Sequence, residues 1–198
     1  MDAFGLAAYG VWMGDNSMFA DVVARVAKAS NDMTIDSVYK GDLDTVTTSL
    51  SGEFGWRFDL ARTVWIEPQI EATYTHAGAE DLTLSNGVNA ATYEIGDFDS
   101  LIGRMGVRAG FNFPKDKGLV YARASVLHDF KGESEAVASL GAKSVRMSDD
   151  IGGTWGEFGV GANFRLTPAT YTYVDLERTT GGEVSEMWRW NVGVRHVF

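Results

Sequence analysis

The last eleven residues of the chain, 188–198, alternate between two kinds of side chain and end on an aromatic residue. The mostly apolar set comprises Trp188, Trp190, Val192, Val194, His196 and Phe198. The set between them is mostly polar or small and comprises Arg189, Asn191, Gly193, Arg195 and Val197. Successive side chains of a β-strand point to opposite faces of a sheet, so the pattern predicts a strand with one apolar and one polar face. A barrel strand with lipid outside and water inside requires this alternation.

The same period of two recurs along the whole chain. In residues 46–58, Phe54 and Trp56 share one predicted face. Glu53 and Arg57 share the other. The alternating segments number nine, at 4–13, 18–28, 46–58, 64–75, 101–113, 120–130, 156–166, 172–177 and 188–198. The first two are the least regular, and the second also fits a short helix.

The connections between these segments alternate in length. The tight ones are 14–17, 59–62, 114–118 and 167–169, and the longer, mostly acidic ones are 29–45, 77–98, 132–152 and 179–186. Outer-membrane barrels have short periplasmic turns and longer extracellular loops. We therefore predict an all-β, antiparallel, up-and-down transmembrane β-barrel with its tight turns in the periplasm.

Composition excludes several other classes of protein. A chain of 198 residues fits one domain, and none of its apolar runs approaches the ~20 residues of a membrane helix. The net charge of −10 argues against nucleic acid as a partner, because phosphate binding needs a basic face. The absence of cysteine excludes disulfides, thiolate catalysis and cysteine zinc sites. Residues 1–4 do not resemble the start of a signal peptide, so we expect a mature portion of a protein or a shortened reading frame.

The alternation alone also fits a soluble barrel or sandwich, in which the apolar face is the core. Two rows of aromatic residues on the apolar face favour the membrane alternative, because such rows mark the two water interfaces of a bilayer. The row beside the tight turns comprises Trp12, Trp56, Phe58, Phe111, Phe113 and Phe164, and the row beside the long loops comprises Tyr74, Phe130 and Trp188. We predict that these residues form two aromatic girdles.

Charged residues occupy the opposite face and are predicted to line the lumen of the barrel. They are Glu53, Arg57, Glu67, Glu71, Arg104, Arg108, Arg123, Glu157, Arg165, Asp175, Glu177, Arg189 and Arg195. The simpler interpretation is that they pair with one another and make a water-filled interior tolerable. The alternative is a hydrated ladder that holds a translocating chain or helix.

The number of predicted strands is odd, whereas bacterial single-chain barrels have an even number with both termini in the periplasm. At least one strand is therefore expected to precede Phe4. An open edge in lipid leaves unpaired amides that cost several kcal/mol each. The pattern thus predicts a fragment of a larger barrel.

Two adjacent predicted strands resemble a known family. Residues 50–58, Leu-Ser-Gly-Glu-Phe-Gly-Trp-Arg-Phe, and 64–69, Val-Trp-Ile-Glu-Pro-Gln, are similar to consecutive strands of the autotransporter β-domain of type V secretion. Stretches similar to later strands of that family follow in the same order at 103–110, 121–130, 159–163, 173–177 and 193–198. The chain departs from the family at His196, where an aromatic residue such as Tyr is usual. It also lacks the first strands and a passenger.

The resemblance implies a barrel of about twelve strands threaded by an N-terminal helix that leads to the passenger. Residues 1–198 would then be one domain that holds the C-terminal nine strands. It implies a protein of the bacterial outer membrane that, with the barrel-assembly machinery, lets its own passenger reach the cell surface. A stand-alone structural or adhesin barrel without a passenger is the alternative.

The terminal strand has a further role by resemblance, as an assembly signal that the machinery reads by strand addition. Its proposed residues are Phe198, His196, Val194, Val192 and Trp190. The same outward residues also fit simple contact with lipid, and both roles are compatible.

The sequence gives little support for catalysis, cofactor binding or a metal site. His76, His128 and His196 lie far apart along the chain, so a serine–histidine–aspartate set would need to be shown by geometry. The acidic pairs at 42–44 and 149–150 do not match the spacing of a calcium-binding loop. An outer-membrane hydrolase with an acid–histidine cluster at the loop rim is the third functional class considered.

Overall fold

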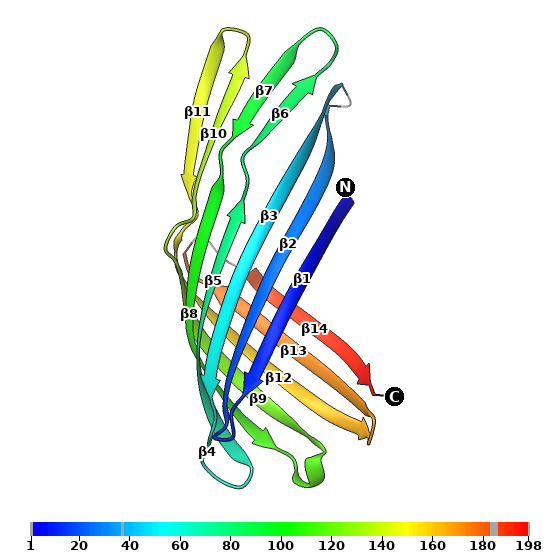
Figure 1. The fold of residues 1–198 in the computed structure, drawn as a ribbon, viewed down its shortest axis with the longest axis vertical. Helices are drawn as coiled ribbons and strands as arrows, with labels where there is room; N and C mark the ends of the chain where they lie inside the picture. Colours follow the sequence, from blue (N-terminus) through cyan, green and yellow to red (C-terminus); the bar gives the residue numbers. More distant parts are fainter. Residues whose placement is uncertain (1, 37, 183–185, 198) are drawn as a thin grey trace.

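The computed structural model describes residues 2–36, 38–182 and 186–197, which form one antiparallel sheet (Figure 1). Its long strands are β1 (Asp2–Met13), β2 (Met18–Ile35), β3 (Tyr39–Trp56), β5 (Val64–Ala77), β8 (Phe98–Asn112), β9 (Gly118–Asp129), β12 (Gly153–Thr167), β13 (Thr170–Thr180) and β14 (Glu186–His196). Each of them overlaps one of the nine predicted segments, so the predicted all-β architecture is confirmed, although β2, β3 and β13 are longer than predicted. No helix in these ranges is long and apolar enough to cross a bilayer.

Each long strand pairs with the next one along the chain, as the up-and-down prediction requires. The short β4 (Phe58–Asp59) pairs with β5, and the tight connection after β8 contains the 3₁₀ turn η1 (Pro114–Asp116). The sheet curls without closing, and β1 and β14 form the two edges of its long-strand part within the described residues (Figure 1).

Residues 18–28 belong to a strand, and the helical alternative is wrong. β2 pairs with β3 without interruption from Met18 opposite Trp56 to Ile35 opposite Tyr39. The β-branched side chains of β2 favour an extended backbone because their χ1 angles are restricted in a helix. The pairing continues through most of residues 29–45, so the long loop predicted there is wrong, and β2 and β3 form one long hairpin.

Two of the predicted long loops contain hairpins instead. Residues 77–98 include β6 (Glu80–Ser85) and β7 (Ala90–Ile95), and residues 132–152 include β10 (Glu133–Leu140) and β11 (Lys143–Asp150). β7 pairs with β10, and Ser85 of β6 pairs with Lys40 of β3, so the hairpins join one sheet. They stand beyond the long strands at the upper end of the molecule in Figure 1.

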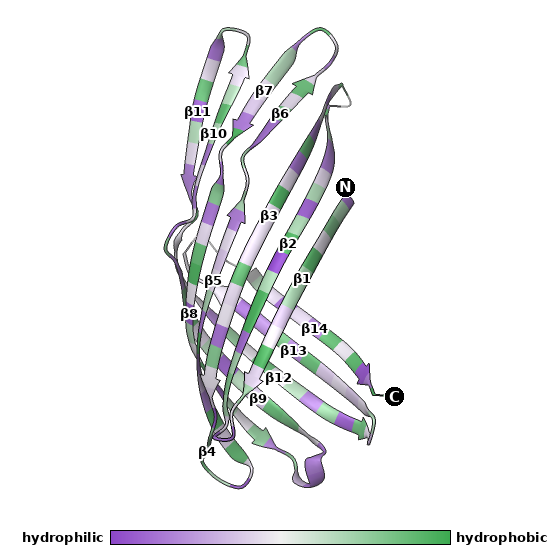
Figure 2. Ribbon diagram, in the orientation of Figure 1, coloured by the Kyte–Doolittle hydropathy of each residue, from purple (hydrophilic) through white to green (hydrophobic). Residues whose placement is uncertain are grey.

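In the middle of the sheet, from β5 to β13, the apolar side of the long strands is largely exposed and the polar side is largely buried. Val126 and Phe158 have 59% and 53% of their surface exposed, whereas Glu67 and Glu157 have 2% and 8%. The two chemistries alternate along the strands in Figure 2. A soluble sheet buries its apolar face, because water drives apolar surface inward. The observed sidedness is the one that a lipid-facing barrel wall needs.

This outward apolar surface, called here the apolar band, has a defined upper edge. On β3 the outward positions from Val46 downward are apolar except Thr48, whereas the next outward residue above Val46 is Asp44. Asp44 binds Lys28 of β2 on the same face, with 2.7 Å between Oδ2 and Nζ. Above this level the inner side becomes apolar, because Leu82 and Leu84 of β6 are buried beside Gly41. The apolar band is therefore confined to the lower, long-strand part of the sheet.

Candidate functional site

The polar inner face of the sheet brings most of the predicted charged residues together in two groups. The first group is centred on Glu67 of β5. Its Oε1 accepts a hydrogen bond from Arg108 Nη2 at 2.6 Å, and its Oε2 accepts one from Arg57 Nε at 3.0 Å. Arg108 lies directly opposite Glu67 on β8, so the strand register creates the pair. One carboxylate with only 3% of its side chain exposed thus holds two guanidinium groups.

Gln69 extends the first group toward the middle of the sheet. Its Nε2 donates to Glu67 Oε1 at 2.9 Å, and its Oε1 accepts from Arg104 Nη2 at 3.3 Å. Arg104 also binds Glu71, its cross-strand neighbour, with 2.9 Å between Nη1 and Oε2. The result is a continuous ladder of polar contacts along the inner faces of β5 and β8.

The second group is centred on Glu177 of β13, which is also nearly completely buried. Its carboxylate binds Arg123 of β9 and Arg189 of β14. Arg123 also approaches Glu157 of β12, with 3.7 Å between Nε and Oε1. Tyr121 donates a hydrogen bond to Asp175 on the same face. Each group therefore pairs its arginines with buried or partly buried carboxylates, as expected for charges that line a solvated interior.

Three predicted charged residues lie outside these groups. Glu53 of β3 is partly buried on the inner face, opposite Asp21 and Glu71, and makes no ion pair with a described residue. Arg165 lies at the tight-turn end, where its Nη2 donates to the Pro168 carbonyl at 3.1 Å. Arg195 is exposed at the same end of β14. The inner face is thus not one uniform ladder.

Inward-facing aromatic residues are a part of the site that the sequence analysis missed. Trp65 has no exposed surface, and Arg57 and Arg108 stack on its ring at 4.0 and 5.3 Å. Its indole Nε1 donates to Asn112 Oδ1 at 3.0 Å. Trp65 lies over Gly110, its direct cross-strand partner, where any side chain would overlap the ring. Glycine therefore allows the close approach.

Three further aromatic residues lie over a cross-strand glycine in the same way. The pairs are Phe19 with Gly55, Tyr121 with Gly161, and Tyr173 with Gly193. Every aromatic member stands near the start of a strand that follows a tight connection. Together with Trp65 they form an inward row of rings at the tight-turn end of the sheet.

Comparison with known proteins agrees with the geometry of the sheet. The family model named Autotransporter beta-domain matches residues 1–177. The chain belongs to this family. It is 27% identical over 197 residues to the autotransporter CRAC of Citrobacter rodentium (strain ICC168), covering 96% of this chain and 12% of that protein. It is 26% identical over 207 residues to the autotransporter adhesin/invasin TibA of Escherichia coli O78:H11, covering 98% and 20%.

A third relative, the serine protease SepA autotransporter of Shigella flexneri, is 24% identical over 200 residues, covering 98% of this chain and 14% of that protein. The chain thus spans between 12% and 20% of the length of these three relatives. Autotransporter β-domains are translocators of the Gram-negative outer membrane, so the predicted localisation is confirmed. The protease activity of such relatives lies in their passengers, outside the matched domain.

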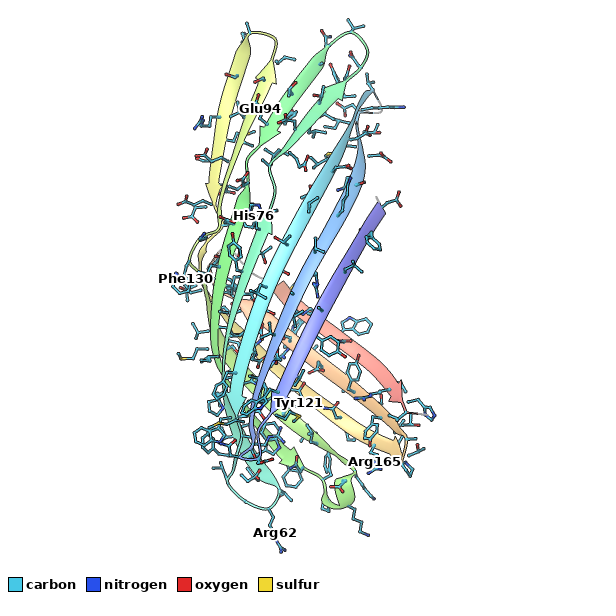
Figure 3. All side chains as sticks on the ribbon, in the orientation of Figure 1. Arg62, His76, Glu94, Tyr121, Phe130 and Arg165 are labelled. Atoms are coloured by element: carbon cyan, nitrogen blue, oxygen red, sulfur yellow. The ribbon has the colours of Figure 1, made fainter. Side chains whose placement is uncertain are left out.

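In the autotransporter β-domain described here, the predicted girdle residues all lie on the outward face. Near the tight turns, Trp56 packs on Phe58 at 4.4 Å between ring centroids, and Phe113 stacks on Phe164 at 5.9 Å. Trp12 and Phe111 belong to the same lower row. Tyr74, Phe130 and Trp188 are exposed at the upper edge of the apolar band. Figure 3 labels Phe130 well above Arg62, which marks the tight-turn end.

The upper edge of the apolar band contains an acid–histidine contact, the feature that the hydrolase alternative requires. His76 Nδ1 lies 2.9 Å from Asp99 Oδ1, and Tyr74 donates to the same oxygen at 2.7 Å. No serine hydroxyl among the described residues bonds to His76. His128 Nδ1 lies 2.7 Å from the Thr154 hydroxyl, and His196 Nδ1 lies 2.9 Å from the Thr170 hydroxyl. No serine–histidine–aspartate set is assembled among the described residues.

The described part of the terminal strand presents its predicted assembly residues at the edge of the sheet. Trp190, Val192 and Val194 point outward and are largely exposed. His196 Nδ1 lies 2.9 Å from the Thr170 hydroxyl on β13. Phe198 lies outside the described residues. Recognition of this strand by a partner stays a prediction.

Proposed function

We propose that this domain anchors an autotransporter in the outer membrane and supports export of its passenger to the cell surface. The observation that supports the proposal is that the apolar face of the sheet is exposed and the polar face is buried, the reverse of a soluble sheet. Exposed apolar side chains suit lipid contact, whereas buried ion pairs line the opposite face of the same strands. A wall with this arrangement encloses a hydrated path when the sheet is closed.

The inner face suits passage of a polypeptide rather than tight binding of a small ligand. The carboxylates of Glu67 and Glu177 are saturated by two arginines each. Paired charges keep the path hydrated without presenting a strong net charge to a passing chain. The large share of each relative that lies outside the match also agrees with a separate passenger.

The function is tested in the full-length protein by fusing a reporter domain ahead of the β-domain. We expect the protein in outer-membrane fractions to migrate faster in gels before heating than after, because closed barrels resist denaturation by detergent. We also expect protease added to intact cells to remove the reporter. A soluble, cytosolic protein would contradict the anchoring role, and an inserted barrel whose reporter stays protected would contradict export alone.

The proposed partnership with the barrel-assembly machinery predicts unequal effects of two changes in the terminal strand. Deleting Phe198 is expected to reduce the amount of inserted protein about tenfold, because an edge strand is recognised through its outward side chains. Arg195→Gln, which changes the opposite face, is the matched control and should have little effect. Quantitative blotting of heat-modifiable protein in membranes measures both. Equal losses in the two variants would argue against recognition of the outward residues.

A further inference from the structure

The apolar band contains a hollow across β8, β9, β12 and β13. Its volume is about 630 Å³, and the outward side chains that line it are all apolar. Ala109, Ala122 and Ala162 form its floor, between the larger side chains of Phe111 and Leu176. Ala109 and Ala122 are direct cross-strand partners, so two small side chains meet in an otherwise bulky surface. A hollow of this chemistry accepts a hydrocarbon chain.

A second hollow of about 400 Å³ lies next to the first, at the tight-turn end. Phe113, Pro114, Lys115, Lys117 and Phe164 line it. The two hollows are adjacent because Phe111, which lines the first, contacts Phe113, which lines the second, at 5.7 Å between ring centroids. The Arg165 amide donates to the Lys117 carbonyl at 2.9 Å and holds the turn against β12. An apolar groove thus ends at a turn with two lysines.

The two lysine side chains are available for an anion. Both residues are exposed, and neither ammonium group forms an ion pair with a carboxylate of a described residue. Asp116, between them, is the turn's own negative charge, so the turn keeps one net positive charge. Figure 2 shows this turn as a hydrophilic segment directly below the strands. Cations immediately beside an apolar membrane surface attract anionic lipid headgroups.

We propose that the two hollows form one binding site for a phosphatidylglycerol-type phospholipid in the leaflet at the tight-turn side. One acyl chain lies in the apolar hollow, and the phosphate lies against Lys115 and Lys117. The aromatic pair Phe113 and Phe164 stands at the level of the glycerol backbone, where aromatic rings favour the interface. The site requires the outward orientation of the apolar band and does not depend on passenger export.

The test uses the full-length protein in phosphatidylcholine vesicles that contain a minor fraction of spin-labelled phosphatidylglycerol or spin-labelled phosphatidylcholine. Electron paramagnetic resonance measures how much of each label is immobilised by the protein. We expect an association preference of about tenfold for phosphatidylglycerol, since each cation near a membrane surface contributes to binding of anionic lipid. Equal association of the two labels would overturn the proposal.

Variants separate the two halves of the site. The double substitution Lys115→Gln and Lys117→Gln should abolish most of the preference, whereas Lys131→Gln, at the opposite edge of the apolar band, should leave it intact. Ala122→Leu fills the groove from the lipid side and should reduce immobilised phosphatidylglycerol although both lysines remain. An unchanged preference without the two lysines, or unchanged immobilisation in Ala122→Leu, would contradict the assignment. A protein that does not insert overturns both this site and the anchoring role, whereas an inserted protein without lipid preference overturns only the site.

Discussion

Replacing Met105 with arginine is expected to lower the free energy of unfolding of the protein in a bilayer by about 2 to 4 kcal/mol. Met105 lies within the apolar band, and 71% of its surface is exposed. Its cross-strand neighbours Ile70 and Val126 are also apolar and exposed. A guanidinium group at this position would lose its hydration to lipid, and the surrounding side chains offer it no partner.

Met105→Leu is the matched control, because it keeps an apolar side chain of similar volume on the same surface. Urea titrations of the full-length protein in vesicles, followed by tryptophan fluorescence, measure both variants. If the apolar face met water instead of lipid, the arginine would be nearly neutral, as are most exposed substitutions in soluble proteins. An unchanged free energy of unfolding in Met105→Arg would therefore contradict the lipid-facing assignment.

The nine long strands were predictable because two solvents constrain them at once. Lipid requires apolar residues on one face and the hydrated interior requires polar residues on the other, so nearly every position between Val46 and Phe58 is fixed in chemistry. β2 was the weakest prediction because short apolar residues such as Val23 and Ala27 also occupy its inner face. Periodicity then no longer separates strand from helix.

The hairpins above the apolar band were missed because their sidedness is reversed. Leu82 and Leu84 alternate with polar residues, as a strand requires, but they point to the inner side of the sheet. The acidic composition of 77–98 and 132–152 is typical of loops. Pairing of β7 with β10 stabilises both hairpins through contacts distant in sequence, which local patterns do not show.

The candidate site was predictable as a set of charged residues but not as pairs. Two features decide which arginines bind Glu67: the register between β5 and β8, and the turn that places Arg57 beside Glu67. The sequence leaves both features undefined. Trp65 is hard to predict as an inward residue because a tryptophan on a polar face looks like a break in the alternation. The sequence feature that indicates its position is Gly110, because an inward glycine opposite a large ring allows the two strands to pack closely there.

Replacing Glu67 with alanine is expected to lower the free energy of unfolding by about 2 to 3 kcal/mol. The substitution leaves Arg57 and Arg108 without the carboxylate that both bind, and their guanidinium groups, which both stack on Trp65, then repel each other. About 30% of each arginine side chain is exposed, so water recovers part of the loss. This exposure keeps the expected effect below that of a fully buried ion pair.

Glu53→Ala provides the matched control on the same inner face, because Glu53 is partly buried yet makes no ion pair with a described residue. Its effect on the free energy of unfolding should be well below that of Glu67→Ala. Combining Glu67→Ala with Arg108→Ala should cost less than the sum of the two single changes, since removing both partners leaves fewer unpaired charges. Equal effects of Glu67→Ala and Glu53→Ala, with additive double substitution, would mean that water alone solvates the arginines and that the buried carboxylate does not organise the inner face.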